Sequence, residues 1–369
     1  MPIRTMDKKI IFFGGVGSST TFGGELTKNK EIIARLKELG CDVTLIDSFQ
    51  SRKNPLKLLK LLLRFLSCIL LYSQATFIFS TSFGNIYPLF KVLSRLPLKL
   101  HIVYWVIGGA FAERVVKGEF QRKYLEIVDL FIVEGYKMKK QMAGLGFDNT
   151  IYKPNFKKVG TLPKIKKADD GKIHFLFISR IVLDKGCRYI MQCVSDLNQK
   201  GLANKYVVDF YGNIENGAYR QEFEREVAAI ANVNYCGTLQ LRDERNYEIL
   251  ARYHYMLFPT YWKGEGFPGV VIDAYKAGVP IIASDWNLNS ESIKKGVTGI
   301  LIPTHSAVKL CEAMEGAISG KFDNAALSAN CQEEVWRFDT RRVINEKLVE
   351  MIINIRRRKS LISQGSEAW

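Results

Sequence analysis

Hydrophobic and polar positions follow a repeating order along the chain: a short apolar run, a polar loop and an amphipathic stretch. The apolar run 9–13 leads into a glycine-rich loop, the amphipathic stretch 27–39 ends at Gly40, and a second apolar run follows at 42–47. Apolar runs bounded by glycine predict buried strands, and the stretch with helical period between them predicts a helix. This order is typical of a parallel sheet with helices on both faces.

The same order continues through two halves of the chain. Further strands are predicted at 76–80, 98–107, 130–133, 173–178, 206–211, 233–235, 256–258, 279–284 and 300–302. Between the halves, the polar and basic stretch 157–171 holds too few apolar residues to form a core. We therefore predict an α/β protein with two Rossmann-like domains, 1–165 and 166–340, followed by a C-terminal helix and basic tail at 341–369.

Composition narrows the class of protein. The chain has 369 residues, of which 47% are hydrophobic and 24% charged, which suits two globular domains. The seven cysteines form no CxxC pair and the four histidines no HxxxH pair, so we expect a reduced, cytoplasmic protein without a metal site or a cofactor. The N-terminus leads directly into the first predicted strand, so no signal peptide is expected.

Glycines gather at the predicted carboxyl ends of the first-half strands. The GGVG sequence at 14–17 lacks the third glycine of a dinucleotide fingerprint, which argues against NAD. Glycines without side chains instead permit a ligand to approach the backbone closely. The candidates at this edge are Gly15, Gly17, Gly23, Gly24, Gly108 and Gly109.

The second half carries charged residues in two loops that each follow a strand and precede a helix. Arg180 and Lys185 lie in the first loop, where two cations and free backbone amides can bracket a diphosphate. The second loop holds Glu265, and the helix after it holds Asp273, so two carboxylates lie near a helix N-terminus. Taken singly, each has a simpler interpretation as a helix cap or a solvated charge.

The stretch 255–280 resembles the donor-binding signature of the family 4 retaining glycosyltransferases of the GT-B fold. The resemblance is carried by Glu265, by the turn Gly266-Phe267-Pro268-Gly269, and by a second acid after seven intervening positions. That second acid is Asp273 where the family usually has Glu. The resemblance implies two Rossmann-like domains facing across a cleft, with the first acid on the donor sugar and the second on the ribose.

Other segments of the second half also resemble motifs of this family, and they occur in the same order along the chain. The resemblance implies that Arg180 and Lys185 neutralise the leaving diphosphate and act with Glu265 as the catalytic set. It further implies that donor binding includes Gly15, Gly17 and a loop beside the nucleobase, and that the acceptor side includes four other glycines. The loop consists of Gly237, Thr238 and Leu239, and the acceptor-side glycines are Gly23, Gly24, Gly108 and Gly109.

Charge is unevenly distributed along the chain. The net charge is +16, and residues 1–165 carry 26 Lys and Arg against 12 Asp and Glu. Such a basic half is attracted to anionic surfaces such as phospholipid or a pyrophosphate-linked lipid. Within it, 56–72 has Lys57, Lys60 and Arg64 at helical spacing among leucines. This pattern suits an amphipathic helix in a membrane interface, or a helix packed on the sheet with its cations in solvent.

Together these features predict a retaining glycosyltransferase that moves a sugar from a uridine diphosphate-linked donor to a hydroxyl of a lipid-linked oligosaccharide. Its expected place is surface polysaccharide assembly (capsule, O-antigen or exopolysaccharide) on the cytoplasmic, inner face of the membrane. The alternatives are a non-transferring GT-B enzyme such as a nucleotide-sugar epimerase, and a basic nucleic-acid-binding protein. No nucleic-acid motif or aromatic stacking platform accompanies the basic residues, so nucleic acid is not an expected partner.

Overall fold

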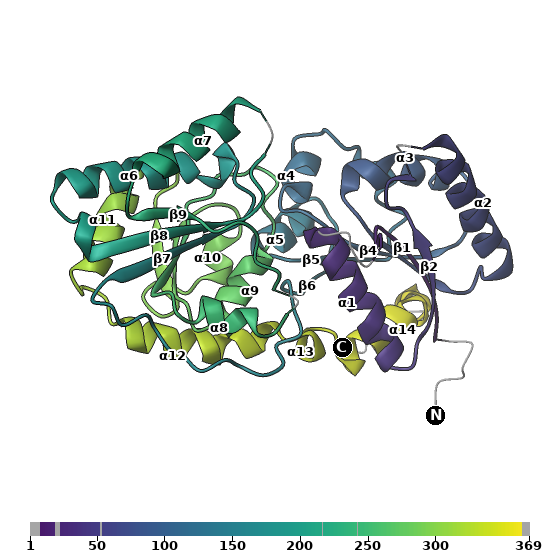
Figure 1. Cartoon of the computed structure of the whole chain (residues 1–369). Coiled ribbons are helices and arrows are strands. Elements are labelled where there is room, and N and C mark those ends of the chain that lie inside the picture. Colours follow the sequence, from purple (N-terminus) through teal and green to yellow (C-terminus); the bar gives the residue numbers. More distant parts are fainter. Residues whose placement is uncertain (1–7, 19–22, 52–53, 216, 242, 364–369) are drawn as a thin grey trace. The chain divides into compact units, whose positions relative to one another are not determined.

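The computed structural model describes residues 8–18, 23–51, 54–215, 217–241 and 243–363 (Figure 1). The chain divides into two compact units: unit 1 consists of 1–158 and 339–369, and unit 2 of 159–338. The domain boundaries expected from the sequence, near 165 and 340, lie close to the boundaries of these units. The C-terminal segment, expected as a separate helix and tail, is part of unit 1. Within the predicted basic tail, the side chains from residue 356 onward lie outside the described part of the chain.

Unit 1 is built on a parallel sheet of six strands in the order β2-β1-β3-β4-β5-β6. The strands are β1 (Lys9–Gly14), β2 (Asp42–Asp47), β3 (Thr76–Ser80), β4 (His101–Trp105), β5 (Leu130–Val133) and β6 (Thr150–Tyr152). The helices of this unit are α1 (Gly24–Glu38), α2 (Pro55–Leu71), α3 (Phe83–Leu93), α4 (Phe111–Val116), α5 (Tyr136–Gly144), α13 (Thr340–Val343) and α14 (Glu346–Ser363).

The two faces of this sheet have different cores because strand side chains alternate between them. On one face, Ile10 and Phe12 pack in a cluster with α1 and with α14, which returns from the far end of the sequence. On the other face, Phe13 packs against Phe65 of α2 and Phe79 of β3, with ring centroids 5.9 and 5.5 Å away. Unit 1 therefore requires the C-terminal helix to complete one of its two cores.

Unit 2 repeats the architecture with a second parallel sheet in the order β12-β11-β10-β7-β8-β9. Its strands are β7 (Ile173–Ile178), β8 (Tyr206–Tyr211), β9 (Val233–Tyr235), β10 (Tyr255–Phe258), β11 (Ile281–Ser284) and β12 (Gly299–Ile302). Its helices are α6 (Cys187–Gln199), α7 (Ala218–Ala229), α8 (Asn246–Leu250), α9 (Gly269–Lys276), α10 (Asn289–Ser292), α11 (Ala307–Ile318) and α12 (Asn324–Glu334).

The predicted fold class is confirmed: both halves are α/β units with parallel sheets. The segment 243–253 contains only the short helix α8 (Asn246–Leu250). In each parallel sheet the carboxyl ends of all strands meet at one edge, where α/β proteins place their ligands. The loops after β7, β9 and β10 therefore share one edge of unit 2.

Candidate active site

The clearest charged pair of unit 2 joins the loops after two neighbouring strands. Strands β7 and β10 lie side by side, with Met256 paired to Leu176. Lys185 ends a short 3-10 helix (Leu183–Lys185) after β7, and its Nζ donates to Oε2 of Glu265 in the loop after β10. Only 8% of the Lys185 side chain and 11% of the Glu265 side chain are exposed. The structure thus brings two predicted catalytic residues together from positions 80 residues apart.

The close approach of these two loops depends on Gly186. Its φ is +80°, and a Cβ placed on it would lie 2.3 Å from the carbonyl oxygen of Pro259. Next to it, the backbone N–H of Tyr261 donates to the carbonyl of Asp184 at 2.8 Å. A residue with a side chain would meet both a strained backbone and a steric clash at this point. This explains why glycine follows Lys185.

A buried threonine, Thr260, orients the carboxylate of Glu265. Thr260 is fully buried, and its Oγ1 donates to Oε2 of Glu265 at 3.0 Å. Oε2 therefore accepts from both Lys185 and Thr260, and neither of these contacts uses Oε1. Thr260 did not emerge from the sequence because a lone threonine after a strand carries no distinctive pattern.

Arg180 lies in the same loop as Lys185 but is exposed to solvent. Its guanidinium carbon is 5.0 Å from the ring centroid of Trp262, a distance at which a cation interacts with an aromatic face. The Trp262 backbone is held by hydrogen bonds to its carbonyl from Trp286 Nε1 at 2.8 Å and from the N–H of Glu265 at 3.0 Å. Arg180 therefore lies beside the loop that carries Trp262 and Glu265.

Asp273, the second acid of the signature, lies on α9 and is 3% exposed. Its Oδ1 accepts a hydrogen bond of 2.7 Å from the hydroxyl of Tyr247, a residue of α8. Burial, and then the charge of Asp273, raise the pKa of Tyr247 far above its ordinary value, so this phenol stays protonated. Asp273 therefore has a buried protein partner as well as its predicted role at the ribose.

The turn before α9 combines buried and partly exposed positions. Phe267 is 3% exposed and packs on Phe338 with 5.1 Å between ring centroids, so its side chain belongs to the core. Pro268 is the N-cap of α9 and is also buried, while Gly266 and Gly269 are partly exposed. The part of this turn open to a ligand is thus the backbone of its glycines.

The loop predicted beside the nucleobase follows β9 at the same edge of the sheet. Gly237 has a φ of +75°, and its carbonyl accepts a 2.7 Å hydrogen bond from the N–H of Gly212, which follows β8. Thr238 is exposed and Leu239 is half-buried. The loop is therefore anchored at Gly237, and Thr238 is its exposed residue.

In unit 1, the glycine-rich loop after β1 is bound to Asp47. The carboxylate of Asp47 accepts hydrogen bonds from the N–H of Val16 at 2.9 Å and of Gly17 at 3.2 Å. The amide of Gly17, predicted to face donor phosphates, therefore already has an intramolecular partner. The loop remains partly exposed from Val16 onward, whereas Gly15 is buried.

The other predicted glycines of unit 1 lie at two turns of the same edge. Gly23 is the N-cap of α1, and Gly24 begins that helix; both are exposed. Gly108 and Gly109 follow β4 and are half-exposed, and a Cβ on Gly108 would meet no atom within 4 Å. Gly108 instead requires its left-handed backbone, with a φ of +96°.

Sequence reasoning missed one carboxylate beside these glycines. Glu25 lies in the first turn of α1, with Oε1 3.4 Å from the place of a Cβ on Gly15. Burial raises its pKa above the ordinary value, against the opposing effect of hydrogen bonds with Thr81 and the backbone of Ser82. An acid directly after a Gly-Gly pair at a helix start was the available signal.

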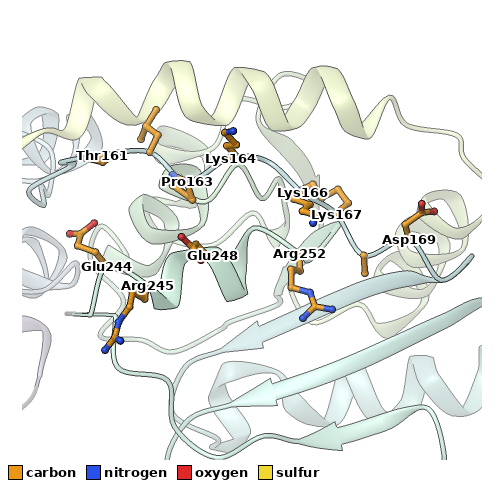
Figure 2. A pocket seen from close by; sticks show the side chains of 12 residues that line it. Thr161, Pro163, Lys164, Lys166, Lys167, Asp169, Glu244, Arg245, Glu248 and Arg252 are labelled. Atoms are coloured by element: carbon orange, nitrogen blue, oxygen red, sulfur yellow. The ribbon is translucent and has the colours of Figure 1, made fainter.

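A cavity lies elsewhere in unit 2 (Figure 2). It measures about 910 Å³ and lies between the segment 161–169 and α8, with Lys164, Arg245 and Glu248 among its lining residues. Its lining includes none of the predicted site residues. We therefore place the candidate site at the sheet edge, where charged groups converge, rather than in this cavity of mixed charge.

Within the described ranges, no group of three or more His, Cys, Asp or Glu is arranged to hold a metal ion. Among the helices that the structure describes, none combines the length and apolar character needed to cross a membrane.

Comparison with known proteins shows what unit 2 is similar to. Residues 159–334, nearly all of unit 2, match the family model of glycosyl transferases group 1. A curated relative, an uncharacterized 41.2 kDa protein in the cps region of Klebsiella pneumoniae, is 24% identical over 240 residues. That match covers 61% of this chain and 63% of the relative.

Solved structures extend the likeness of fold to both units. Sucrose-phosphate synthase from Thermosynechococcus elongatus matches with a TM-score of 0.70 and 14% identity, covering 96% of this chain and 100% of that chain. Anabaena HepE, solved in complex with UDP, matches with a TM-score of 0.62 and 15% identity, with coverage of 96% and 100%. The pneumococcal O-GlcNAc transferase GtfA, in complex with UDP and GlcNAc, matches with a TM-score of 0.58 and 17% identity, covering 79% of this chain and 60% of that chain.

These matches confirm the GT-B fold and, at the level of unit 2, the predicted enzyme class. Residues 159–334, within unit 2, are similar to the glycosyl transferases group 1 family.

Proposed function

We propose that the protein is a retaining glycosyltransferase of family 4 that transfers a sugar from a uridine diphosphate-linked donor. The observation that carries the proposal is the pairing of Lys185 with Glu265 beside Arg180 at the carboxyl edge of the unit 2 sheet. Two cations and a carboxylate in adjacent loops match what a sugar diphosphate presents: two negative phosphates and several hydroxyls. The complexes of HepE and GtfA with UDP support the choice of nucleotide.

In the proposed reaction, unit 2 holds the donor and unit 1 the acceptor. Arg180 and Lys185 stabilise the charge that develops on the diphosphate as the glycosidic bond breaks, where electrostatic help lowers the barrier most. Oε1 of Glu265 accepts a hydroxyl of the donor sugar. The leaving diphosphate itself receives the proton of the acceptor hydroxyl on the same face of the sugar, so the configuration is retained.

For the acceptor we propose a lipid-linked oligosaccharide, used in surface polysaccharide assembly on the inner face of the membrane. The relative in a cps (capsule) region supports this pathway, and the net charge of +14 on residues 1–165 suits an anionic, lipid-pyrophosphate acceptor. A non-transferring epimerase has less support, because Gly108 and Gly109 place no acid or base side chain at their turn.

The test is Lys185→Ala, measured as turnover with a UDP-sugar and as stability. We expect kcat to fall on the order of a hundredfold, as when a charge-stabilising donor is removed. Because the variant leaves Glu265 buried without its partner, it will also lose about 3–5 kcal/mol of stability. Turnover close to that of the wild type would exclude the proposed role of Lys185.

Two controls separate catalysis from folding. The double variant Lys185→Ala/Glu265→Gln removes both charges, so we expect its Tm to recover while its turnover stays low. Lys200→Ala removes an exposed lysine paired with Glu315 far from this edge, and we expect unchanged turnover. A thermal-shift panel of UDP, ADP and GDP on the wild type then tests the nucleotide independently of any acceptor.

A further inference from the structure

Helix α2 has three faces with different surroundings. It starts at the N-cap Asn54, whose side chain accepts the N–H of Lys57 at 3.1 Å. One face packs on the sheet through Leu61, Phe65, Cys68 and Ile69, all buried. The two expectations for 56–72, membrane contact and packing on the sheet, therefore concern different faces of one helix.

The second face is a stripe of exposed leucines. These side chains recur at intervals of three and four residues, so they form one stripe along the helix. We call it the leucine face; its members and exposed fractions are Leu56 (71%), Leu59 (54%), Leu63 (55%), Leu66 (53%) and Leu70 (83%). A contiguous exposed apolar surface of this kind marks an interaction site for a protein or a membrane.

The third face carries three cations and lines a cavity of about 580 Å³. Lys57, Lys60 and Arg64 line it together with residues of the loop after β1, including Gly17. The one acid among the described lining residues is Asp47, whose oxygens already accept backbone N–H groups of that loop and of Phe49. The cavity is therefore strongly basic, beside an apolar stripe on the same helix.

The sequence around α2 has the same excess of positive charge. Between Asp47 and Glu113 the chain contains eight Lys and Arg and no Asp or Glu. This segment includes α2 and α3 in full. A protein partner would have to carry a matching excess of acid, whereas an anionic bilayer offers negative head groups directly next to an apolar layer. Charge complementarity therefore favours the bilayer as the occupant of this surface.

We propose that α2 docks unit 1 onto an anionic phospholipid bilayer, with the leucine face in the apolar layer and a lipid phosphate in the basic cavity. Lying in the interface suits a helix of 17 residues with one apolar and one cationic face. The inference rests on the proposed function, because the enzyme would encounter a lipid-linked acceptor at the surface of the bilayer. It deepens that function by naming the element and the lipid chemistry.

The experiment is co-sedimentation of the full chain with vesicles of phosphatidylcholine, alone and mixed with phosphatidylglycerol. We expect binding to the mixed vesicles only, and weaker binding at high salt. Lys60→Glu/Arg64→Glu should weaken it at least tenfold, because each cation near an anionic surface contributes measurably to affinity. Leu63→Ser/Leu66→Ser should weaken it similarly, since both side chains then lose their apolar environment. Lys200→Glu is the matched control and should bind like the wild type.

Three outcomes would overturn the proposal: equal binding to both vesicle types, unchanged binding of the variants, or a leucine variant that alters only the oligomeric state in size-exclusion chromatography. The last result would identify the leucine face as an interface between two copies.

All substituted residues are exposed, so folding is checked by Tm alone. The thermal shift caused by UDP is measured on every variant. Lost vesicle binding with a retained UDP shift separates a failure at the membrane from a failure of the nucleotide site.

Discussion

At the scale of single residues, the site depends on buried charges whose partners are known. Lys185 and Glu265 neutralise each other in a buried region, where an unpaired charge would lower the stability of the fold. Asp273 is buried with a phenol as partner. At these three residues, a donor that binds therefore exchanges one set of partners for another.

Variants of Asp273 distinguish its contribution to stability from its contribution to UDP binding. In Asp273→Ala the hydroxyl of Tyr247, itself 5% exposed, loses its acceptor, and we expect about 1–3 kcal/mol of lost stability. Asp273→Asn keeps an acceptor for Tyr247, so its Tm should stay near that of the wild type while its affinity for UDP falls. Calorimetric titration with UDP measures the latter.

Tyr247→Phe is the control for this pair, because it alters the partner and leaves the acid in place. We expect it to lower Tm and to retain UDP affinity. If Asp273→Asn bound UDP as tightly as the wild type, the ribose role would be excluded and Asp273 would serve the packing of α8 on α9 alone.

At the scale of elements, the site depends on the contact between the start of α6 and the end of β10. Gly186 is the point of contact with Pro259. Gly186→Ala combines the cost of a left-handed backbone, about 1–2 kcal/mol, with a clash in a packed region of about 1–3 kcal/mol. We expect lower stability and weaker UDP binding, because Lys185 precedes the displaced residue.

The matched control is Gly201→Ala in the same unit. Gly201 has a φ of +79°, nearly that of Gly186, but a Cβ on it would meet no atom within 4 Å. Chemical denaturation should show the backbone cost alone for Gly201→Ala and a clearly larger loss for Gly186→Ala. Equal losses would show that the approach to Pro259 is not tight in solution.

At the scale of the whole molecule, unit 1 is assembled from both ends of the chain. Six buried side chains from the C-terminal segment join its core: Val343, Ile344, Leu348, Val349, Ile352 and Ile353. At about 1.5–3 kcal/mol for each buried aliphatic side chain, their burial is comparable to the entire stability of a typical domain, about 5–15 kcal/mol.

We therefore predict that a chain ending at Phe338 loses the folded state of unit 1, while unit 2 remains folded. Limited proteolysis followed by mass spectrometry would show rapid cleavage within 8–158 and protection within 159–338. A chain ending at Ser363 keeps all six side chains and serves as the control. Protection of unit 1 in the shorter chain would contradict the prediction.

Much of this protein could be predicted from local sequence. The alternation of apolar runs with amphipathic stretches determines the parallel α/β class, since each pattern specifies one element and the faces it must bury. Local spacing also located Arg180, Lys185 and Glu265 in loops after strands. Parallel pairing then placed those loops at one edge of a sheet.

Tertiary structure alone decided which of these residues meet. Lys185 contacts Glu265 because β10 lies next to β7, and this strand order is set by packing between distant segments that no local pattern records. The same holds for α14, which completes the core of the unit that begins the chain. It holds too for α2, whose leucine pattern is equally suited to core or surface: one face of the helix packs on the sheet, and the leucine face is left exposed.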